Sequence, residues 1–361
     1  MKILLLSAYD AQSHRYWRTG LVEQFPEHDW TTLTLPARHF SWRLRGNSLT
    51  WAYSEREVLE RHYDLVVATS MTDLSALKGL VPNLARIPSV VYFHENQFAY
   101  PESGKAFQSV EPKMLNIYTA LAADRVVFNS DYNRTTFLAG CRYLLKKLPD
   151  HVPDGLPELI EHKTSVIPVP LINDAFHQQG QKEKPLNIVW NHRWEYDKGP
   201  NELLRAIRRL GEKTKAFKLH VVGQQFRQAP EHFERLREEF SAQIGAWGYV
   251  ESEEKYRAIL RRSDVVLSTA LHDFQGISVL EAVASGCLPL VPKRLAYPEL
   301  FDEKYCYEQT GDEAQNLADK LDRYVQLKAQ GKMPVAPDVS HLNWTALEGR
   351  YRRLLERDFS S

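Results

Sequence analysis

The segment 273–286, DFQGISVLEAVASG, carries the most specific chemical pattern in the sequence. It follows an apolar run, and its glycines predict a helix that begins near Gly276 and ends at Gly286. The first backbone N–H groups of a helix lack partners within it, and the helix dipole favours negative charge there. We therefore expect the amides of Gly276, Ile277 and Ser278 to bind a diphosphate.

Two acidic residues flank this helix start. Glu281 lies a turn and a half into the helix, where its carboxylate can accept hydrogen bonds from ribose hydroxyls. Asp273 precedes the helix and is placed to hold sugar hydroxyls. The alternative is an ordinary helix start with a solvated acid.

A second pattern, WNHRWEYDKGP, spans 190–200 and reads as a strand end followed by a helix with proline at its start. Arg193 and Lys198 can bring a planar guanidinium and an ammonium to one pair of phosphates and so neutralise a departing nucleotide. The alternative is a surface ion pair between Arg193 and Glu195.

Two series of apolar runs predict the strands that position these segments. In order, these runs are 3–6, 31–35, 65–68, 90–93, 126–128 and 165–169, then 186–190, 219–222, 265–267 and 288–291. The first series ends near Pro168 and Pro170, and a polar stretch follows. We expect an α/β fold with an N-terminal domain at 1–172, a linker at 173–185 and a C-terminal domain at 186–340. Residues 341–361 predict an amphipathic closing helix, capped by Asn343, that packs back on the N-terminal domain.

Polar residues also follow predicted strands of the first domain, where ligands collect in open α/β sheets. His94 begins the run HENQ, and Asn129 ends the next strand. We expect both to line a ligand cleft, although a lone histidine is more often structural. The loop 7–14 lacks paired glycines, which leaves open whether it contacts a phosphate or an acceptor.

Two basic segments are candidate acceptor-binding surfaces. The first, LPARHFSWRLRG, carries Arg38, Trp42, Arg43 and Arg45, a mixture of cations and aromatic rings that suits RNA. The second carries Lys146 and Lys147. Both remain open to two other interpretations, a solvated helix face or an amphipathic surface that touches anionic lipid.

Composition narrows the class of protein. The 361 residues include 46 Lys plus Arg and 46 Asp plus Glu, so attraction to nucleic acid must come from local patches. Three isolated cysteines argue against a disulfide framework or a structural zinc site and fit a reducing cytoplasm. No D-x-D motif or metal-spaced cluster occurs, so we expect no catalytic metal and no cofactor. No run reaches the length of a membrane span, and we expect no stable membrane association.

Arg193, Lys198 and the acidic pair eight residues apart resemble the donor-site signature of retaining glycosyltransferases with the GT-B fold, which use nucleotide sugars. This resemblance implies two doubly wound Rossmann-like domains that face a central cleft. It also implies that His94 lies beside the transferred sugar. Asp273 departs from the usual glutamate and has a shorter reach.

Longer runs resemble one family more closely. LPARHFSWRLRG, TSMTDLSAL, YFHENQFAYP, ADRVVFNSDYN, WNHRWEYDKGP and DFQGISVLEAVASG, among others across nearly the whole chain, are similar to the tRNA-queuosine mannosyltransferase family. The resemblance implies transfer of mannose, with retention, from GDP-mannose to the cyclopentenediol of queuosine at the wobble position of tRNA-Asp.

The expected site residues follow from both lines of reasoning. For catalysis they are His94, Arg193, Lys198 and Asp273; for the donor Gly276, Ile277, Ser278, Glu281 and Asn129; for the acceptor His14, Arg38, Trp42, Arg43, Arg45, Glu95, Asn96, Lys146 and Lys147. Two alternatives remain open. One is transfer to a lipid, glycan or small molecule, and the other is a non-catalytic protein that binds a nucleotide sugar or RNA. The sequence does not predict an oligomeric state.

Overall fold

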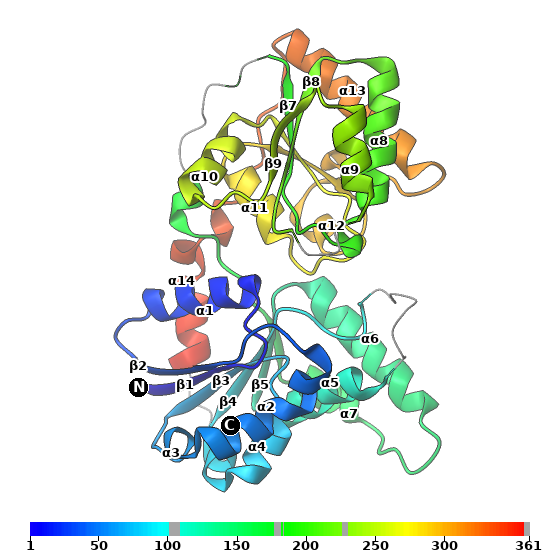
Figure 1. Ribbon diagram of the computed structural model, residues 1–361. Coiled ribbons are helices and arrows are strands. Elements are labelled where there is room, and N and C mark those ends of the chain that lie inside the picture. The colour runs from blue at the N-terminus through cyan, green and yellow to red at the C-terminus, as the bar shows by residue number, and fades with distance from the viewer. Residues whose placement is uncertain (101–108, 177–181, 183, 226–229, 357–361) are drawn as a thin grey trace. The chain divides into compact units, whose positions relative to one another are not determined.

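The computed structural model describes the chain except residues 101–108, 177–181, 183, 226–229 and 357–361. The chain divides into two compact units. Unit 1 comprises Met1–Pro170 and Leu347–Ser361, and unit 2 comprises Leu171–Ala346. Each unit is an α/β sandwich with one parallel sheet (Figure 1).

The sheet of unit 1 has six parallel strands in the order β2-β1-β3-β4-β5-β6. Their bounds are β1 Lys2–Ser7, β2 Asp29–Thr34, β3 Leu65–Thr69, β4 Ser89–Phe93, β5 Arg125–Phe128 and β6 Thr164–Val166. The central strands are apolar on both faces because helices cover both. The direction of strand order reverses between β1 and β3, so their carboxyl ends form a topological switch point.

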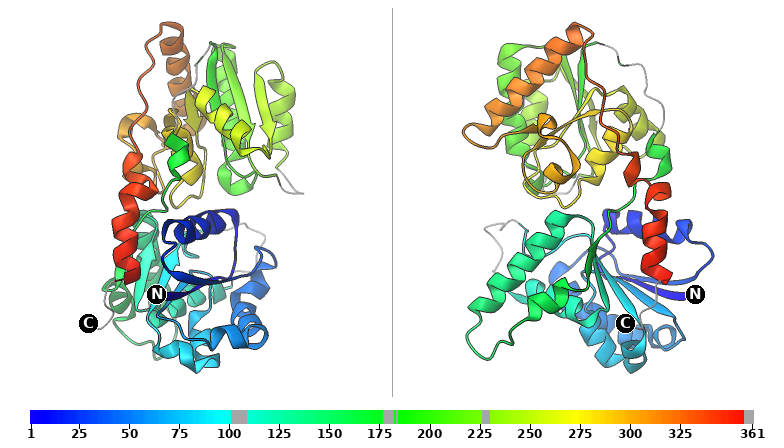
Figure 2. Two further views of the ribbon diagram at one scale, coloured as in Figure 1. Left: turned by 90° about the vertical axis from the view of Figure 1, so that its left-hand side faces the viewer. Right: turned by 180° about the vertical axis from the view of Figure 1, so that it is seen from behind.

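Helices cover the two faces of this sheet unequally. One face carries α2 Phe40–Ser54, α3 Arg56–Leu59, α4 Leu74–Leu80, α5 Glu111–Ala122, α6 Asp131–Lys147 and α7 Leu156–Glu161, with a 3-10 turn at Pro82–Arg86. The other face carries α1 Gln12–Gln24 and the closing helix α14 Trp344–Glu356 (Figure 2). The indole N–H of Trp17 in α1 donates to the hydroxyl of Tyr351 in α14 at 3.0 Å, which fixes the two helices to each other. Asn343 caps α14 by accepting from the amide of Ala346 at 2.7 Å.

The sheet of unit 2 has the order β12-β11-β10-β7-β8-β9, again all parallel. Its strands are β7 Leu186–Trp190, β8 Phe217–Val222, β9 Ile244–Gly248, β10 Val265–Leu267, β11 Leu288–Pro292 and β12 Cys306–Tyr307. The chain runs outward from β7 to β9 and then returns to β10 on the other side of β7. This is the doubly wound Rossmann order, with its switch point between β7 and β10.

The helices of unit 2 are α8 Pro200–Lys213, α9 His232–Glu239, α10 Glu253–Arg262, α11 Ile277–Ala284, α12 Tyr297–Leu300 and α13 Glu313–Ala329. Short 3-10 turns occupy Asn173–Phe176, Tyr196–Lys198, Glu303–Tyr305 and Ser340–Leu342. Helix α13 packs beside α8, with α9 on α8's other side (Figure 1). No helix in the described residues is both long and apolar enough to cross a bilayer.

The division between the units differs from the predicted linker at 173–185. The structure places it after Pro170. The turn Asn173–Phe176 packs on α11, and the Ser285 hydroxyl donates to the Ala175 carbonyl at 3.3 Å. These residues therefore belong to unit 2, while 177–181 and 183 lie outside the described residues.

Candidate functional site

The segments that the sequence singled out in unit 2 follow neighbouring strands. Arg193 and Lys198 lie in the connection after β7, and Asp273 and Gly276 lie in the connection after β10. Strands β7 and β10 are paired in the sheet, so both connections leave its carboxyl edge at the switch point. The fold therefore brings the two patterns together.

The two cationic side chains converge on one carboxylate. Asp197 Oδ2 lies 3.5 Å from Lys198 Nζ and 3.8 Å from Arg193 Nη2. Asp197 is almost completely buried. The sequence analysis assigned it no role, since an acid between two cations reads as a solvated residue. The structure makes it the group that holds both cations at one place.

Lys198 is the deeper of the two cations and is only 8% exposed. Its ammonium donates to the His272 carbonyl at 2.6 Å and lies 3.6 Å from Asp273 Oδ2. The Thr269 hydroxyl donates to the Lys198 carbonyl at 2.8 Å. The next residue, Gly199, has φ 66°, and a Cβ there would lie 2.0 Å from the Thr269 carbonyl oxygen. Only glycine permits this approach between the two connections.

The alternative ion pair of Arg193 is also present. Its Nη1 lies 2.7 Å from Glu195 Oε2, and the Arg193 side chain is about half exposed. Burial raises the pKa of Glu195, while Arg193 lowers it. Arg193 thus contacts both Glu195 and the buried Asp197, and its exposed guanidinium lies at the outer side of the cluster.

Helix α11 begins as predicted, at Gly276, which has the left-handed values φ 72° and ψ 46°. One detail of the prediction is wrong. The Gly276 N–H already donates to the Asp273 carboxylate, at 2.8 Å to Oδ1, so it is not open to a diphosphate. No side chain caps the helix, so the amides of Ile277 and Ser278 are the ones available to a ligand.

Asp273 closes the turn before α11. Besides the Gly276 amide, it accepts from the Tyr297 hydroxyl at 3.3 Å. Burial favours the neutral acid, but Lys198, His192 and the Gly276 N–H outweigh it and lower the pKa of Asp273 to about 2. The carboxylate is therefore ionised at neutral pH. Its contacts within the chain explain how the shorter aspartate serves here: it orients Lys198 and the helix start.

The electrostatic environment of Glu281 differs from that of Asp273. Burial raises its pKa to about 7, against the opposing effect of Arg257. The Tyr256 hydroxyl bonds to this carboxyl group and accepts from Asn191 Nδ2 at 2.9 Å. Asn191 also donates to the Ser278 carbonyl at 2.7 Å, so it ties the end of β7 to the first turn of α11. Asn191 stands in the WNHR run that the sequence analysis singled out, and this run is the sequence feature that could have identified its role at the helix start.

His192 is a second residue to which the sequence gave no role. It is buried, and burial together with Lys198 lowers its pKa to about 4. Its Nε2 has no hydrogen-bond partner among the described residues. A neutral imidazole therefore stands beside the charged groups of the site.

In unit 1, His94 lies just after β4 and stacks on His14 of α1, with ring centroids 4.3 Å apart. Both side chains are buried. Burial lowers the pKa of His14 and lowers that of His94 well below its ordinary value. The two predicted site residues are thus in contact and uncharged at neutral pH.

Asn129 and Asn96 have contacts that a prediction of ligand binding did not anticipate. Asn129 donates to the His94 carbonyl at 2.9 Å and accepts from Asn133 at 2.8 Å. Asn96 donates to Asn133 and Thr136 and accepts from two backbone amides. Both amides stabilise the loops after β4 and β5, and their roles toward donor or acceptor stay predictions. Glu95 is partly exposed and accepts from the Tyr100 hydroxyl at 3.3 Å.

The first basic segment is only partly available to a ligand. Arg43 is buried against the Pro36 carbonyl, and Arg45 pairs with Asp73 at 3.0 Å and Glu111 at 3.2 Å. Arg38 is exposed, and Trp42 is 55% exposed with its indole packed over Gly46. Arg45 is also exposed although it is paired, so Arg43 alone of these four residues is buried away from a ligand.

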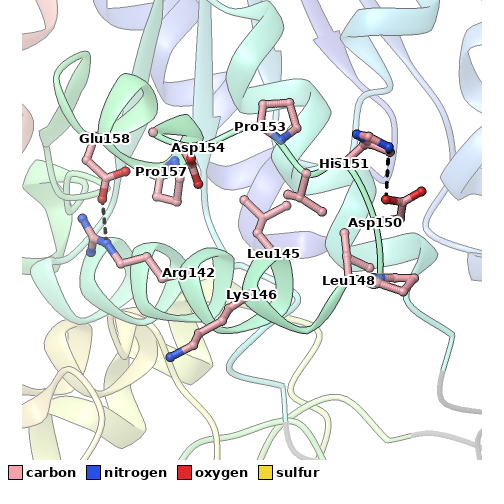
Figure 3. A pocket seen from close by; sticks show the side chains of 13 residues that line it. Arg142, Leu145, Lys146, Leu148, Asp150, His151, Pro153, Asp154, Pro157 and Glu158 are labelled. Carbon is pink, nitrogen blue, oxygen red and sulfur yellow. Dashed lines mark hydrogen bonds and ion pairs between the residues drawn. The ribbon is translucent and has the colours of Figure 1, made fainter.

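The second basic segment lies on another helix. Lys147 bonds to the Tyr143 hydroxyl in the last turn of α6. Lys146 is exposed and lines an open pocket of about 420 Å³ with Leu145, Leu148 and His151 (Figure 3). Helix α6 packs on β5, β6 and α7, whereas α2 packs on α4 and α5. The two basic segments therefore pack on different elements of unit 1.

One group of side chains in the described residues has the spacing of metal ligands: Glu27, His28 and Glu356. Arg352 donates to Glu27 at 2.7 Å and to Glu356 at 3.1 Å. The group is therefore part of an ion-pair network that joins α14 to the turn after α1.

Comparison with known protein families divides the chain where the fold does. Residues 2–171 match the model of the tRNA-queuosine alpha-mannosyltransferase N-terminal domain, and residues 172–335 match glycosyl transferases group 1. A tRNA-queuosine alpha-mannosyltransferase from Drosophila melanogaster is 32% identical over 317 residues, which are 84% of this chain and 83% of that protein.

Solved structures resemble the whole chain. Sucrose-phosphate synthase from Thermosynechococcus elongatus has a TM-score of 0.70 at 14% identity and covers 99% of this chain and 100% of its own. Anabaena HepE in complex with UDP has a TM-score of 0.69 at 16% identity and covers 98% and 99%. These likenesses, with the two parallel sheets, confirm the predicted GT-B fold.

Proposed function

Because the chain belongs to the tRNA-queuosine alpha-mannosyltransferase family, we propose that it moves mannose from GDP-mannose to the cyclopentenediol of queuosine at the wobble position of tRNA-Asp. It is a hexosyltransferase, and its second unit is a group 1 glycosyltransferase domain. The identities of the donor nucleotide, the donor sugar and the tRNA species are our proposal.

The convergence of Arg193 and Lys198 on Asp197, beside the start of α11, carries the proposal. A pyrophosphate needs cations and amide donors at one place, and these must act most strongly when the leaving group gains charge. Lys198 and the Ile277 and Ser278 amides supply that combination in unit 2.

In the proposed reaction, the bond between the anomeric carbon and the β-phosphate oxygen breaks. The same carbon bonds to one hydroxyl oxygen of the diol, and the proton of that hydroxyl passes to the departing phosphate. Lys198 stabilises the charge on the GDP that leaves. Attack from the face that GDP leaves retains the configuration of the sugar.

We propose that the reaction needs no metal ion or other cofactor, because the chain's own cations neutralise the pyrophosphate. Full transfer activity in the presence of EDTA is the expected result. Restoration of a lost activity by added Mg²⁺ would contradict it.

We also propose a cytoplasmic location. The three cysteines, Cys141, Cys287 and Cys306, are buried free thiols, as a reducing compartment permits. The proposed tRNA substrate is found in the same compartment.

The test is transfer with purified components. The protein is incubated with GDP-mannose and queuosine-containing tRNA-Asp, and the nucleosides are then analysed by mass spectrometry. We expect queuosine to gain one hexose, and the same tRNA with guanosine at the wobble position to gain none. Transfer only to a lipid, or no product with any nucleotide sugar, would refute the proposal.

A further inference from the structure

Five buried polar atoms at the carboxyl end of the unit 1 sheet have no hydrogen-bond partner among the described residues, and one of them is Ser70 Oγ. The other four lie on the face that α1 covers. They are Ser7 Oγ, His14 Nδ1, Thr69 Oγ1 and His94 Nε2. Ser7 and Thr69 are fully buried, and the two histidines are at most 5% exposed. Buried polar atoms are paired in most proteins, so four such atoms together need an explanation.

The strand register places three of these side chains on one face. Leu6 of β1 pairs with Ala68 of β3, so Ser7 and Thr69, the next residues, are neighbours at the carboxyl edge. Thr69 pairs with Tyr92 of β4, and His94 lies two residues further on the same face as Tyr92. Adjacent strands are about 4.8 Å apart, which puts the three ends within reach of one small ligand.

Helix α1 covers this same face. Leu4, Leu6, Val66 and Ala68 belong to the core on the opposite face, so the alternating residues Ser7 and Thr69 point toward α1. Trp17 of α1 stacks on Tyr92 with centroids 4.4 Å apart, and His14 stacks on His94. The first turn of α1 has no side-chain cap, which leaves its amides as further hydrogen-bond donors.

The chemistry of the cluster favours an uncharged ligand. Hydroxyls both donate and accept, and a neutral imidazole has one donor and one acceptor nitrogen. Asp10 and Glu95 lie close enough to act on His14 and would repel an anion. The nearby cations Arg15 and Arg18 are paired with Asp10, at 3.5 and 3.1 Å.

We propose that Ser7, His14, Thr69 and His94 form a subsite of unit 1 for a ligand with adjacent hydroxyl groups, and that the loop 7–14 contacts hydroxyls rather than a phosphate. This assignment rests on the proposed function for the identity of the ligand. Adjacent hydroxyls occur on the cyclopentenediol of the acceptor and on the transferred hexose, and the experiment distinguishes them.

The test uses Ser7→Ala and Thr69→Val in the full-length protein. Both substitutions remove a hydroxyl and keep the volume of the site nearly unchanged. Each should lower kcat/KM for queuosine-containing tRNA by roughly three- to tenfold, as loss of one hydrogen bond between uncharged groups does. The matched control is Thr135→Val, whose exposed hydroxyl bonds only within α6, and it should leave the rate unchanged.

Three further measurements show what a loss of kcat/KM in these variants means. The melting temperatures of both variants should equal or exceed that of the wild type, because an unpartnered buried hydroxyl costs stability. An unchanged rate of GDP-mannose hydrolysis without tRNA identifies the diol as the ligand, whereas an equal loss in hydrolysis identifies the hexose. An altered affinity for GDP, or wild-type kcat/KM in both variants, would overturn the subsite.

The proposed function can fail separately. If the wild-type protein transfers no mannose to tRNA, the hydrolysis of nucleotide sugar still reports on the subsite. A loss of hydrolysis in Ser7→Ala and Thr69→Val, with an unchanged affinity for GDP, would then support a hexose subsite. Wild-type hydrolysis in both variants would refute it.

Discussion

The two units use the same position of a parallel sheet for different chemistry. In unit 2, the carboxyl edge at β7 and β10 gathers charged groups that are paired with one another, such as Lys198 with Asp197 and Asp273. In unit 1, the carboxyl edge at β1, β3 and β4 gathers uncharged groups that lack partners, such as Ser7 and Thr69. The fold determines where a ligand binds, and the side chains determine which kind.

The difference has an energetic reason. A buried ammonium such as Lys198 must be paired in the free protein, because an isolated charge costs several kcal/mol to bury. An unpartnered hydroxyl costs only about 1–3 kcal/mol, so a fold tolerates a few of them. The charged groups of unit 2 are therefore paired before the ligand arrives. Among the described residues, unpartnered buried atoms occur in both units, His192 Nε2 in unit 2 and the four atoms of the subsite in unit 1.

The largest expected effect is that of Lys198→Ala. Loss of the ammonium that stabilises the leaving diphosphate should lower kcat about a thousandfold, as loss of an electrostatic donor to a developing charge does. Single-turnover transfer at saturating GDP-mannose measures it. The exposed Lys332→Ala is the control and should keep the wild-type rate. A loss of less than tenfold in Lys198→Ala would contradict the proposed role of Lys198 in stabilising the leaving diphosphate.

Gly199→Ala tests whether the contact between the two connections of unit 2 holds the charged site. We expect the free energy of unfolding to fall by about 2–4 kcal/mol, because a Cβ meets the Thr269 carbonyl and the backbone is left-handed. Urea denaturation measures this change. Gly331→Ala has a similar φ of 69° but open surroundings, so it should lose only about 1 kcal/mol. Equal losses in the two variants would mean that the contact is unimportant.

Glu281 gives the charged site a pH dependence. Its pKa of about 7 means that the carboxyl group is mostly neutral at pH 6 and mostly ionised at pH 8. If only the carboxylate accepts the ribose hydroxyls, KM for the donor should fall about tenfold as the pH rises across this range. Glu281→Gln should abolish the dependence. A KM that rises with pH in the wild type would contradict this role.

The smallest expected effect concerns the exposed surface of unit 1. Trp42→Ala should weaken tRNA binding about fivefold, the loss of one stacked base. Tyr53, on the same helix α2 and 74% exposed, provides the matched control, and Tyr53→Ala should bind normally. Equilibrium binding of tRNA at fixed salt measures both, and melting temperatures check that α2 remains folded. Equal weakening in the two variants would show that this helix has no specific stacking position.

Local pattern was sufficient for much of the fold. The parallel strands were visible because their residues are apolar on both faces, as in Val66–Ala68. The helix of 277–284 was predicted from its two flanking glycines. The short strand at Cys306–Tyr307 and the strand at Ile244–Gly248 were not predicted. The first has only two residues, and the second is half-buried at the sheet edge and is interrupted by glycine, which weakens a strand pattern.

The sequence by itself determined the types of residue available for chemistry and the order of elements that carry them, because apolar runs, prolines and glycines act over a few neighbouring residues. Arg193, Lys198 and the start of α11 were identified in this way. Only the tertiary structure decided their distant partners: Lys198 beside Asp273, Asn191 tied to Ser278, and Asn129 bound to the His94 carbonyl. Such partners arise from strand order and register, which here join residues 35 to 87 positions apart, and no local pattern specifies contacts of that kind.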